Sequence, residues 1–254
     1  GRVPGNGSLD VEFEVPKGRR SEAMLDLWYD RAGTLNLTVT APGGATSGVV
    51  NHGTDIPVNA AAAPFVANPT ATANRRSRVT IDGTINGQHD RNNNFRITIG
   101  SPRRGNLPDG SWKLTLANPN AGAVDFHCWI ERGSNTPWFL PPTTPDDGKV
   151  RASLDATLSI PGTASQVITV ANHASRTSRC DCWPSTGIVS TSSRGPVARG
   201  AAANQKPDIA APGLEITSAK ADAANLRGRG CDCCPDACCC LYEDRDGTSM
   251  AAPH

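Results

Sequence analysis

The sequence is poor in aromatic residues, in methionine and in net charge. Of its 254 residues, 5% are aromatic and 2 are Met, and 25 Lys and Arg stand against 24 Asp and Glu. The resulting net charge of +1 gives no strong field toward nucleic acids or anionic membranes. The sequence also lacks the ~20 consecutive apolar residues that a membrane helix needs. We therefore expect no nucleic-acid partner and no membrane segment in this part of the protein.

Glycine and proline, by contrast, are abundant, with 25 and 20 residues, which is typical of a protein rich in turns and strands. Up to about residue 132, apolar residues recur at every second position in about seven segments. These segments are 11–15, 24–29, 35–39, 79–81, 95–99, 112–116 and 124–130. One apolar face on each segment predicts an antiparallel β-sandwich over residues 1–132, and we expect a jelly-roll strand order.

Three tryptophans lie on these strand patterns: Trp28, Trp112 and Trp129. We expect them to belong to the core rather than to stack on a ligand. Cys128 occupies an inward-facing position of the last segment, and we interpret it as a small buried hydrophobe. The Asp-x-Asn-x-Asn pattern at 90–94 resembles the beginning of a calcium loop, but the glycine and the later bidentate acid are missing. A polar hairpin turn is therefore favoured there.

The last eight residues, GTSMAAPH at 247–254, place a serine hydroxyl on a Gly-Thr turn, before small residues suited to the start of a helix. A catalytic nucleophile needs an exposed side chain, together with N–H groups and a helix N-terminus that stabilise developing negative charge. Pro253 fits the first turn of a helix, because its missing N–H is not needed there. The pattern predicts Ser249 as a catalytic nucleophile.

This segment resembles the serine block of the subtilisin-like serine peptidases (subtilases, peptidase family S8). Three upstream segments resemble further blocks of that family in the family's order: PGTA with VITV at 161–170, SSRGP at 192–196 and KPDIAAPG at 206–213. The resemblance covers about residues 149–254 and implies a mostly parallel sheet. The expected fold class is α/β, the C-terminal half of a subtilisin-like parallel-sheet domain, with an inserted antiparallel β-sandwich (jelly roll).

A jelly-roll domain inserted in the catalytic domain is a feature of the Csp-like subgroup of this family, and the layout here is similar. We expect the sandwich at 1–132, a polar, proline-rich linker at 133–148, and the C-terminal part of the catalytic domain at 149–254. A Cys-rich loop is expected at 222–246 within it. The sandwich is interpreted as a rigid clamp on the peptidase, with binding of a glycan or a partner protein as the alternative.

The family's mechanism needs a histidine that takes the serine proton and an aspartate that orients this histidine. Neither block is present in the sequence. HGT at 52–54 resembles the start of the family's histidine block, but Pro57 would spoil the helix that this histidine opens, so His52 is interpreted as a loop histidine. His254 matches a histidine that is structural in the family, and His89, His127 and His173 fit no better. We interpret the chain as a fragment that carries only the serine block and is inactive alone.

The resemblance implies a serine endopeptidase, a hydrolase that cleaves peptide bonds of a polypeptide substrate through an acyl-enzyme on Ser249. The catalytic Asp and His, and the asparagine that assists the Ser249 N–H as oxyanion donor, are expected outside this chain. Catalysis is expected to need no cofactor, and the resemblance favours an extracytoplasmic or secreted location. The alternative is a pseudo-protease or partner-binding module with a stapled Cys-rich loop.

Eight of the nine cysteines fall in two clusters. Six of them lie within ten residues and cannot all pair, because disulfide geometry is strict. Cys-x-Cys thiolates suit zinc, whereas the usual iron–sulfur spacing is absent. We favour a structural zinc or a mixed metal–disulfide staple, with disulfides or free thiols as alternatives. The candidate metal ligands are Cys180, Cys182, Cys231, Cys233, Cys234, Cys238, Cys239 and Cys240.

Overall fold

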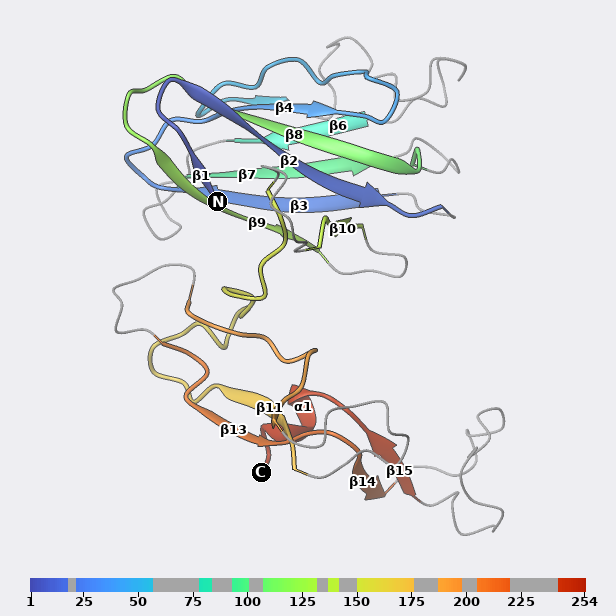
Figure 1. Ribbon diagram of the computed structural model, residues 1–254. Helices are drawn as coiled ribbons and strands as arrows, with labels where there is room; N and C mark the ends of the chain where they lie inside the picture. The colour runs from blue at the N-terminus through green and yellow to red at the C-terminus, as the bar shows by residue number, and fades with distance from the viewer. Residues whose placement is uncertain are drawn as a thin grey trace. The chain divides into compact units, whose positions relative to one another are not determined.

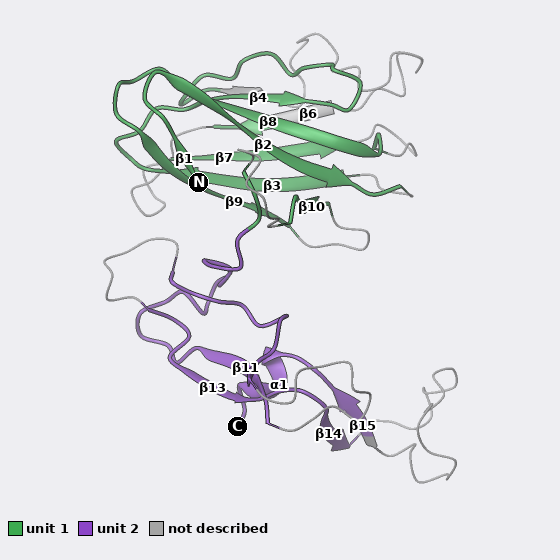
Figure 2. Ribbon diagram, viewed as in Figure 1, with its two compact units in different colours: residues 1–152 green, residues 153–254 purple. Residues whose placement is uncertain are grey.

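The structure is a computed structural model. It describes residues 1–17, 22–56, 78–83, 93–100, 107–131, 137–141, 150–175, 187–197, 205–219 and 242–254. The chain divides into two compact units, Gly1–Ala152 (unit 1) and Ser153–His254 (unit 2), which are coloured separately in Figure 2. Within the described ranges, no helix has the length and apolar character needed to cross a membrane.

Unit 1 is built from two antiparallel β-sheets (Figure 1). One sheet has the strand order β1-β9-β3-β7-β6-β5 and the other has the order β10-β2-β8-β4. The chain passes from one sheet to the other between β2 and β3, and again between β3 and β4. The strands are β1 (Arg2–Val3), β2 (Gly7–Val15), β3 (Glu22–Tyr29), β4 (Asn36–Thr40), β5 (Asp55–Ile56), β6 (Arg78–Asp82), β7 (Asn93–Gly100), β8 (Gly110–Asn118), β9 (Val124–Ile130) and β10 (Trp138–Phe139).

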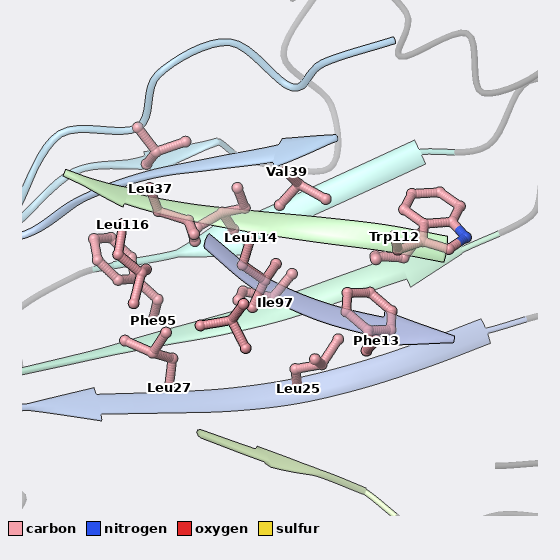
Figure 3. Packing of buried hydrophobic residues seen from close by; sticks show 14 of the residues in the cluster. Phe13, Leu25, Leu27, Leu37, Val39, Phe95, Ile97, Trp112, Leu114 and Leu116 are labelled. Atoms are coloured by element: carbon pink, nitrogen blue, oxygen red, sulfur yellow. The ribbon is translucent and has the colours of Figure 1, made fainter. Parts of the chain in front are cut away.

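The core of unit 1 lies between the two sheets, and the predicted alternation of apolar residues is confirmed. β3 buries every second side chain, and so do β8 from Trp112 and β2 from Val11, because successive side chains point to opposite faces of a strand. Phe13 on β2 stacks on Trp112 of β8, with ring centroids 6.3 Å apart. Figure 3 shows Leu25 and Ile97 of the other sheet facing these rings. The two sheets therefore share one hydrophobic core.

The prediction for the tryptophans is right for Trp112 and wrong for the other two. Trp112 is fully buried, and its indole N–H donates to the carbonyl oxygen of Pro108 at 3.0 Å. Trp28 and Trp129 are only half-buried, because the pleat turns them to the outer face of β3 and β9. On that face, Trp129 stacks on His127 with ring centroids 5.5 Å apart.

Cys128 on β9 packs against the core of unit 1, as the sequence predicts. Burial raises the pKa of its thiol, with a smaller contribution from the nearby Asp26 carboxylate. The thiol is therefore protonated at neutral pH and behaves as a small apolar group.

Two buried asparagines fix the loops of unit 1. Asn93 Nδ2 donates to three main-chain carbonyl oxygens of the segment 30–33, each at 3.1 Å. Asn118 Nδ2 donates to the carbonyl oxygens of Pro4 at 3.2 Å and Gly122 at 2.8 Å. Buried amides cost little stability when they are paired in this way.

Unit 2 has two small sheets and one short helix. The first sheet has the order β12-β11-β13, in which β11 pairs antiparallel with β12 and parallel with β13. The second is an antiparallel ribbon of β14 and β15, and α1 follows it. The bounds are β11 (Val170–Ala174), β12 (Gly187–Ile188), β13 (Ile209–Pro212), β14 (Ile216–Ala219), β15 (Tyr242–Arg245) and α1 (Thr248–Ala251).

The expected α/β class with a parallel-sheet domain is wrong. Regular structure is almost entirely β-strand in mainly antiparallel sheets, and the four-residue α1 is the single helix among the described residues. In that part of the chain, β11 and β13 form the one parallel pair. A parallel-sheet domain needs crossover helices that cover its faces. The described residues of unit 2 form none, so the described part of the chain is all-β in class.

Candidate active site around Ser249

Ser249 is exposed and lies in α1, two residues after Gly247. Gly247 has φ 145 and ψ 166, a backbone conformation that is essentially restricted to glycine. Its carbonyl oxygen accepts hydrogen bonds from the N–H groups of Met250 at 3.0 Å and Ala251 at 3.2 Å. The predicted Gly-Thr turn is therefore present, with the serine on its outer side. We call residues 247–251 the serine turn.

The serine turn is anchored to the sheet of unit 2 through Gly213. The Gly247 N–H donates to the Gly213 carbonyl oxygen at 2.8 Å, and the Gly213 N–H donates to the His173 carbonyl oxygen at 3.2 Å. A Cβ atom on Gly213 would lie 2.6 Å from the Gly247 carbonyl oxygen and 2.9 Å from Cβ of Ala251. Only glycine permits so close an approach, and it lets the buried Ala251 side chain reach the sheet.

The β14–β15 ribbon supports the serine turn from its other end. Asp246, which separates β15 from Gly247, accepts a hydrogen bond from the Glu215 N–H at 2.6 Å. Within the ribbon, the Thr217 hydroxyl donates to the Asp244 carboxylate at 2.5 Å. The turn is thus held on both sides by segments that follow β13.

The KPDIAAPG block ties β13 to the segment before β11. The buried Lys206 ammonium donates to the Asp208 carboxylate at 2.7 Å and to the Val167 carbonyl oxygen at 2.5 Å. The same carboxylate accepts from the Thr169 N–H at 2.7 Å. The hydrogen bond from Lys206, followed by that from Thr169, holds the pKa of the Asp208 carboxyl below its usual range. The VITV segment itself is strand only from Val170 onward.

The SSRGP block supports β11 as well. The Ser192 hydroxyl oxygen accepts a hydrogen bond from the main-chain N–H of Asn172 at 3.0 Å. The Arg194 main chain exchanges hydrogen bonds with Thr157, at 2.9 Å and 2.8 Å. The blocks that are separate in sequence therefore meet around β11. This arrangement suits them to act as a scaffold for the serine turn.

The described histidines are distributed over both units. The His254 ring is hydrogen-bonded through Nδ1 to the Met250 carbonyl oxygen at 2.9 Å, which fits a structural role. His52 in unit 1 has its Nδ1 2.7 Å from the hydroxyl oxygen of Tyr29. His173 lies on β11, opposite Ile188 of β12. Within the ranges that the structure describes, no hydrogen bond joins the Ser249 side chain to a histidine. His89 lies outside those ranges.

The predicted cysteine ligands and most of the 90–94 pattern lie outside the described residues. Where the structure is described, no group of three or more His, Cys, Asp or Glu residues is placed to hold a metal ion. Zinc binding, disulfide pairing and free thiols therefore remain predictions. The residues concerned are Cys180, Cys182, Cys231, Cys233, Cys234, Cys238, Cys239 and Cys240.

Sequence reasoning missed Asn172, which lies behind the serine turn. Its side chain is fully buried, and both Nδ2 and Oδ1 lack a hydrogen-bond partner among the described residues. A signal was available, because asparagine is depleted in strands and this one occupies the middle of β11. Such a residue is expected to serve something other than strand formation.

Comparison with known proteins relates the region around Ser249 to a known family. The sequence model of the subtilase family matches residues 146–254, which include the serine turn and all of its supports. Over these residues the chain is similar to the subtilase family. No curated protein matches the chain.

Among solved structures, the CspB protease of Clostridium perfringens is similar over 100% of this chain, with a TM-score of 0.62 and 19% sequence identity. The chain covers 42% of that protease. At this level of identity the likeness concerns the fold alone. It relates both units of the chain to a protease that is more than twice as long.

Proposed function

We propose that the protein containing this chain is a subtilisin-like serine endopeptidase and that Ser249 is its nucleophile. The observation that carries the proposal is the exposed Ser249 on a glycine-dependent turn, within the region that matches the subtilase family. The KPDIAAPG block anchors this turn through the Gly213 carbonyl oxygen, and two further blocks form hydrogen bonds around β11 and β13.

In the proposed reaction, Ser249 Oγ attacks the scissile carbonyl carbon while its proton passes to a histidine from outside this chain. The resulting oxyanion accepts a hydrogen bond from the Ser249 main-chain N–H, and one such donor lowers the barrier by roughly 3–4 kcal/mol. The carbon–nitrogen bond then breaks and the histidine returns the proton to the leaving amine. Water hydrolyses the acyl-enzyme and frees the serine.

The test is labelling of the full-length protein with a fluorophosphonate, which phosphonylates an activated serine. We expect labelling of the wild type, loss of labelling in Ser249→Ala, and unchanged labelling in Ser165→Ala, a matched control at an exposed serine of unit 2. A correctly folded wild-type protein that takes up no label would end the proposal. It would favour the alternative, a pseudo-protease or partner-binding module.

For unit 1 we propose a jelly-roll topology and a role as a rigid element of the peptidase. The strand orders β1-β9-β3-β7 and β2-β8-β4 support the topology. The continuous core supports the rigid role. Binding of unit 1 to a glycan on a glycan array would favour the alternative role.

For the Cys-rich loop we propose a structural zinc, and for the protein an extracytoplasmic or secreted location. Support for the zinc comes from thiolate chemistry, and support for the location comes from the resemblance to the family. Elemental analysis of the purified, reduced full-length protein tests the zinc. A metal-free, active protein would leave disulfides or free thiols.

A further inference from the structure

Asn172 is an exception among the buried amides of the described chain. Its main chain is fully used, because its N–H donates to the Ser192 hydroxyl at 3.0 Å and its carbonyl oxygen accepts from the Val189 N–H at 3.0 Å. Its carboxamide, at 0% exposure, has no hydrogen-bond partner in the described ranges. An unpaired buried amide costs stability, whereas Asn93 and Asn118 in unit 1 avoid that cost by pairing.

The carboxamide of Asn172 lies against the anchor of the serine turn. A Cβ atom on Gly213 would be 2.4 Å from Asn172 Oδ1 and 2.6 Å from the Gly247 carbonyl oxygen. Both oxygens therefore crowd the same side of Gly213. The Gly247 carbonyl is the first acceptor of the serine turn, so its position determines where the turn, and with it Ser249, is held.

With Oδ1 toward Gly213, the Asn172 and Gly247 oxygens are two negatively polarised atoms on the same side of Gly213, and they repel each other. Neither Nδ2 nor Oδ1 of Asn172 has a hydrogen-bond partner among the described residues that would offset this repulsion. The polar carboxamide therefore acts on the Gly247 carbonyl, which an apolar side chain of the same size does not do.

We propose that Asn172 is a positioning residue for Ser249, whose buried carboxamide sets the place of the Gly247 carbonyl and thereby of the nucleophile. This inference rests on the proposed peptidase function and identifies a further residue that serves it. The unpaired amide lowers stability, and its retention beside the nucleophile is explained by this role. Polar groups left unsatisfied at functional sites are a recognised pattern.

The experiment compares Asn172→Leu, which keeps the side-chain volume and removes its polarity, with the wild-type full-length protein. We expect a thermal midpoint equal to or above that of the wild type, because an unpaired amide is removed. We expect kcat for peptide hydrolysis and the rate of fluorophosphonate labelling to fall about tenfold, since small displacements of a nucleophile are costly. KM should stay within about twofold, because Asn172 is remote from solvent and thus from substrate.

Two further variants keep the outcome decisive. Asn172→Ser retains a hydrogen-bonding group and is expected to have a kcat between those of Asn172→Leu and the wild type. It still tests the inference if the leucine variant fails to fold. Asn118→Ala removes a paired amide from unit 1 and is expected to lower the midpoint while kcat is kept.

Unchanged kcat in both Asn172 variants overturns the inference, and so does a lower midpoint in Asn172→Leu that accounts for the loss of kcat. Labelling of the wild type distinguishes failure of the proposed peptidase function from failure of the role of Asn172. An unlabelled wild type removes the peptidase function and this inference together, whereas a labelled wild type with unaffected Asn172 variants removes this inference alone.

Discussion

Among the described residues, unit 1 buries its apolar side chains and pairs its buried amides more completely than unit 2 does. In unit 1, side chains of both sheets form one continuous core, and the buried asparagines are paired. Among the described residues of unit 2, the corresponding cluster consists of Ala174, Val189 and Leu214. Apolar side chains also lie at the surface of unit 2, where Ile160 is 88% exposed and Ile168 77%.

Unit 1 is thus dominated by its hydrophobic core, whereas the described part of unit 2 is arranged to hold the serine turn. We infer that unit 1 owes its stability to its own core, whereas the described part of unit 2 has a smaller core and carries the serine turn.

The largest effect is expected from the core of unit 1. Trp112→Ala should lower the free energy of unfolding by about 3–5 kcal/mol, because it empties the largest buried site between the sheets. Leu214→Ala in unit 2 should cost closer to about 2 kcal/mol, because its cluster is small. Denaturant unfolding measures both values. Equal losses of unfolding free energy in the two variants would contradict the difference between the two units.

The next effect concerns the glycine of the serine turn. Gly247→Ala forces a side chain into a conformation with φ 145, and we expect a cost of about 1–3 kcal/mol. The labelling rate of Ser249 should fall with it. Gly122→Ala is the matched control, because a Cβ there meets no atom within 4 Å. A Gly247→Ala protein with normal stability and labelling would contradict the geometry of the turn.

A paired amide of unit 1 and the unpaired amide of unit 2 should respond in opposite ways. Asn93→Ala removes the amide that donates to three carbonyl oxygens, and we expect a loss of about 1–3 kcal/mol. Asn172→Leu should cause no loss. Thermal unfolding of the two variants side by side measures this, and destabilisation by both to the same extent would show that the two amides are equivalent.

The smallest effect concerns pH. The Lys206 ammonium lowers the pKa of Asp208 below the usual 3.8, so the folded state favours the ionised carboxyl. The stability from this group is present above pH 3.8 and is lost as the pH falls through the lowered value. Asp208→Asn should therefore reduce the dependence of the unfolding midpoint on pH below about 4. An unaltered acid profile would show that this pair contributes nothing measurable.

The strands of unit 1 were predictable because alternation of apolar residues is a local signal. Phe95, Ile97 and Ile99 repeat every second residue, and a strand that buries one face is the simplest structure with this period. The same signal failed for Trp28 and Trp129. Alternation shows which residues share a face of a strand, but the packing of the other sheet decides which face is inside.

The serine turn was predictable for a different reason. Gly247 and Ser249 follow each other within a short segment, and the backbone freedom of glycine is a property of the residue itself. The role of Gly213 in anchoring that turn depends on a main-chain contact between residues far apart in sequence. The expected α/β class failed because it was carried over from the family and not from the periodicity of residues 149–254.

The sequence by itself determined the strand segments of unit 1, the glycine-dependent turn that carries Ser249 and the blocks that accompany it, since these depend on local periodicity and on the chemistry of single residues. Only the tertiary structure decided which strands pair, which tryptophans face outward and that a buried, unpaired Asn172 lies behind Ser249. The physical reason is that burial and pairing are properties of contacts between distant segments, and these exist only once the chain has folded.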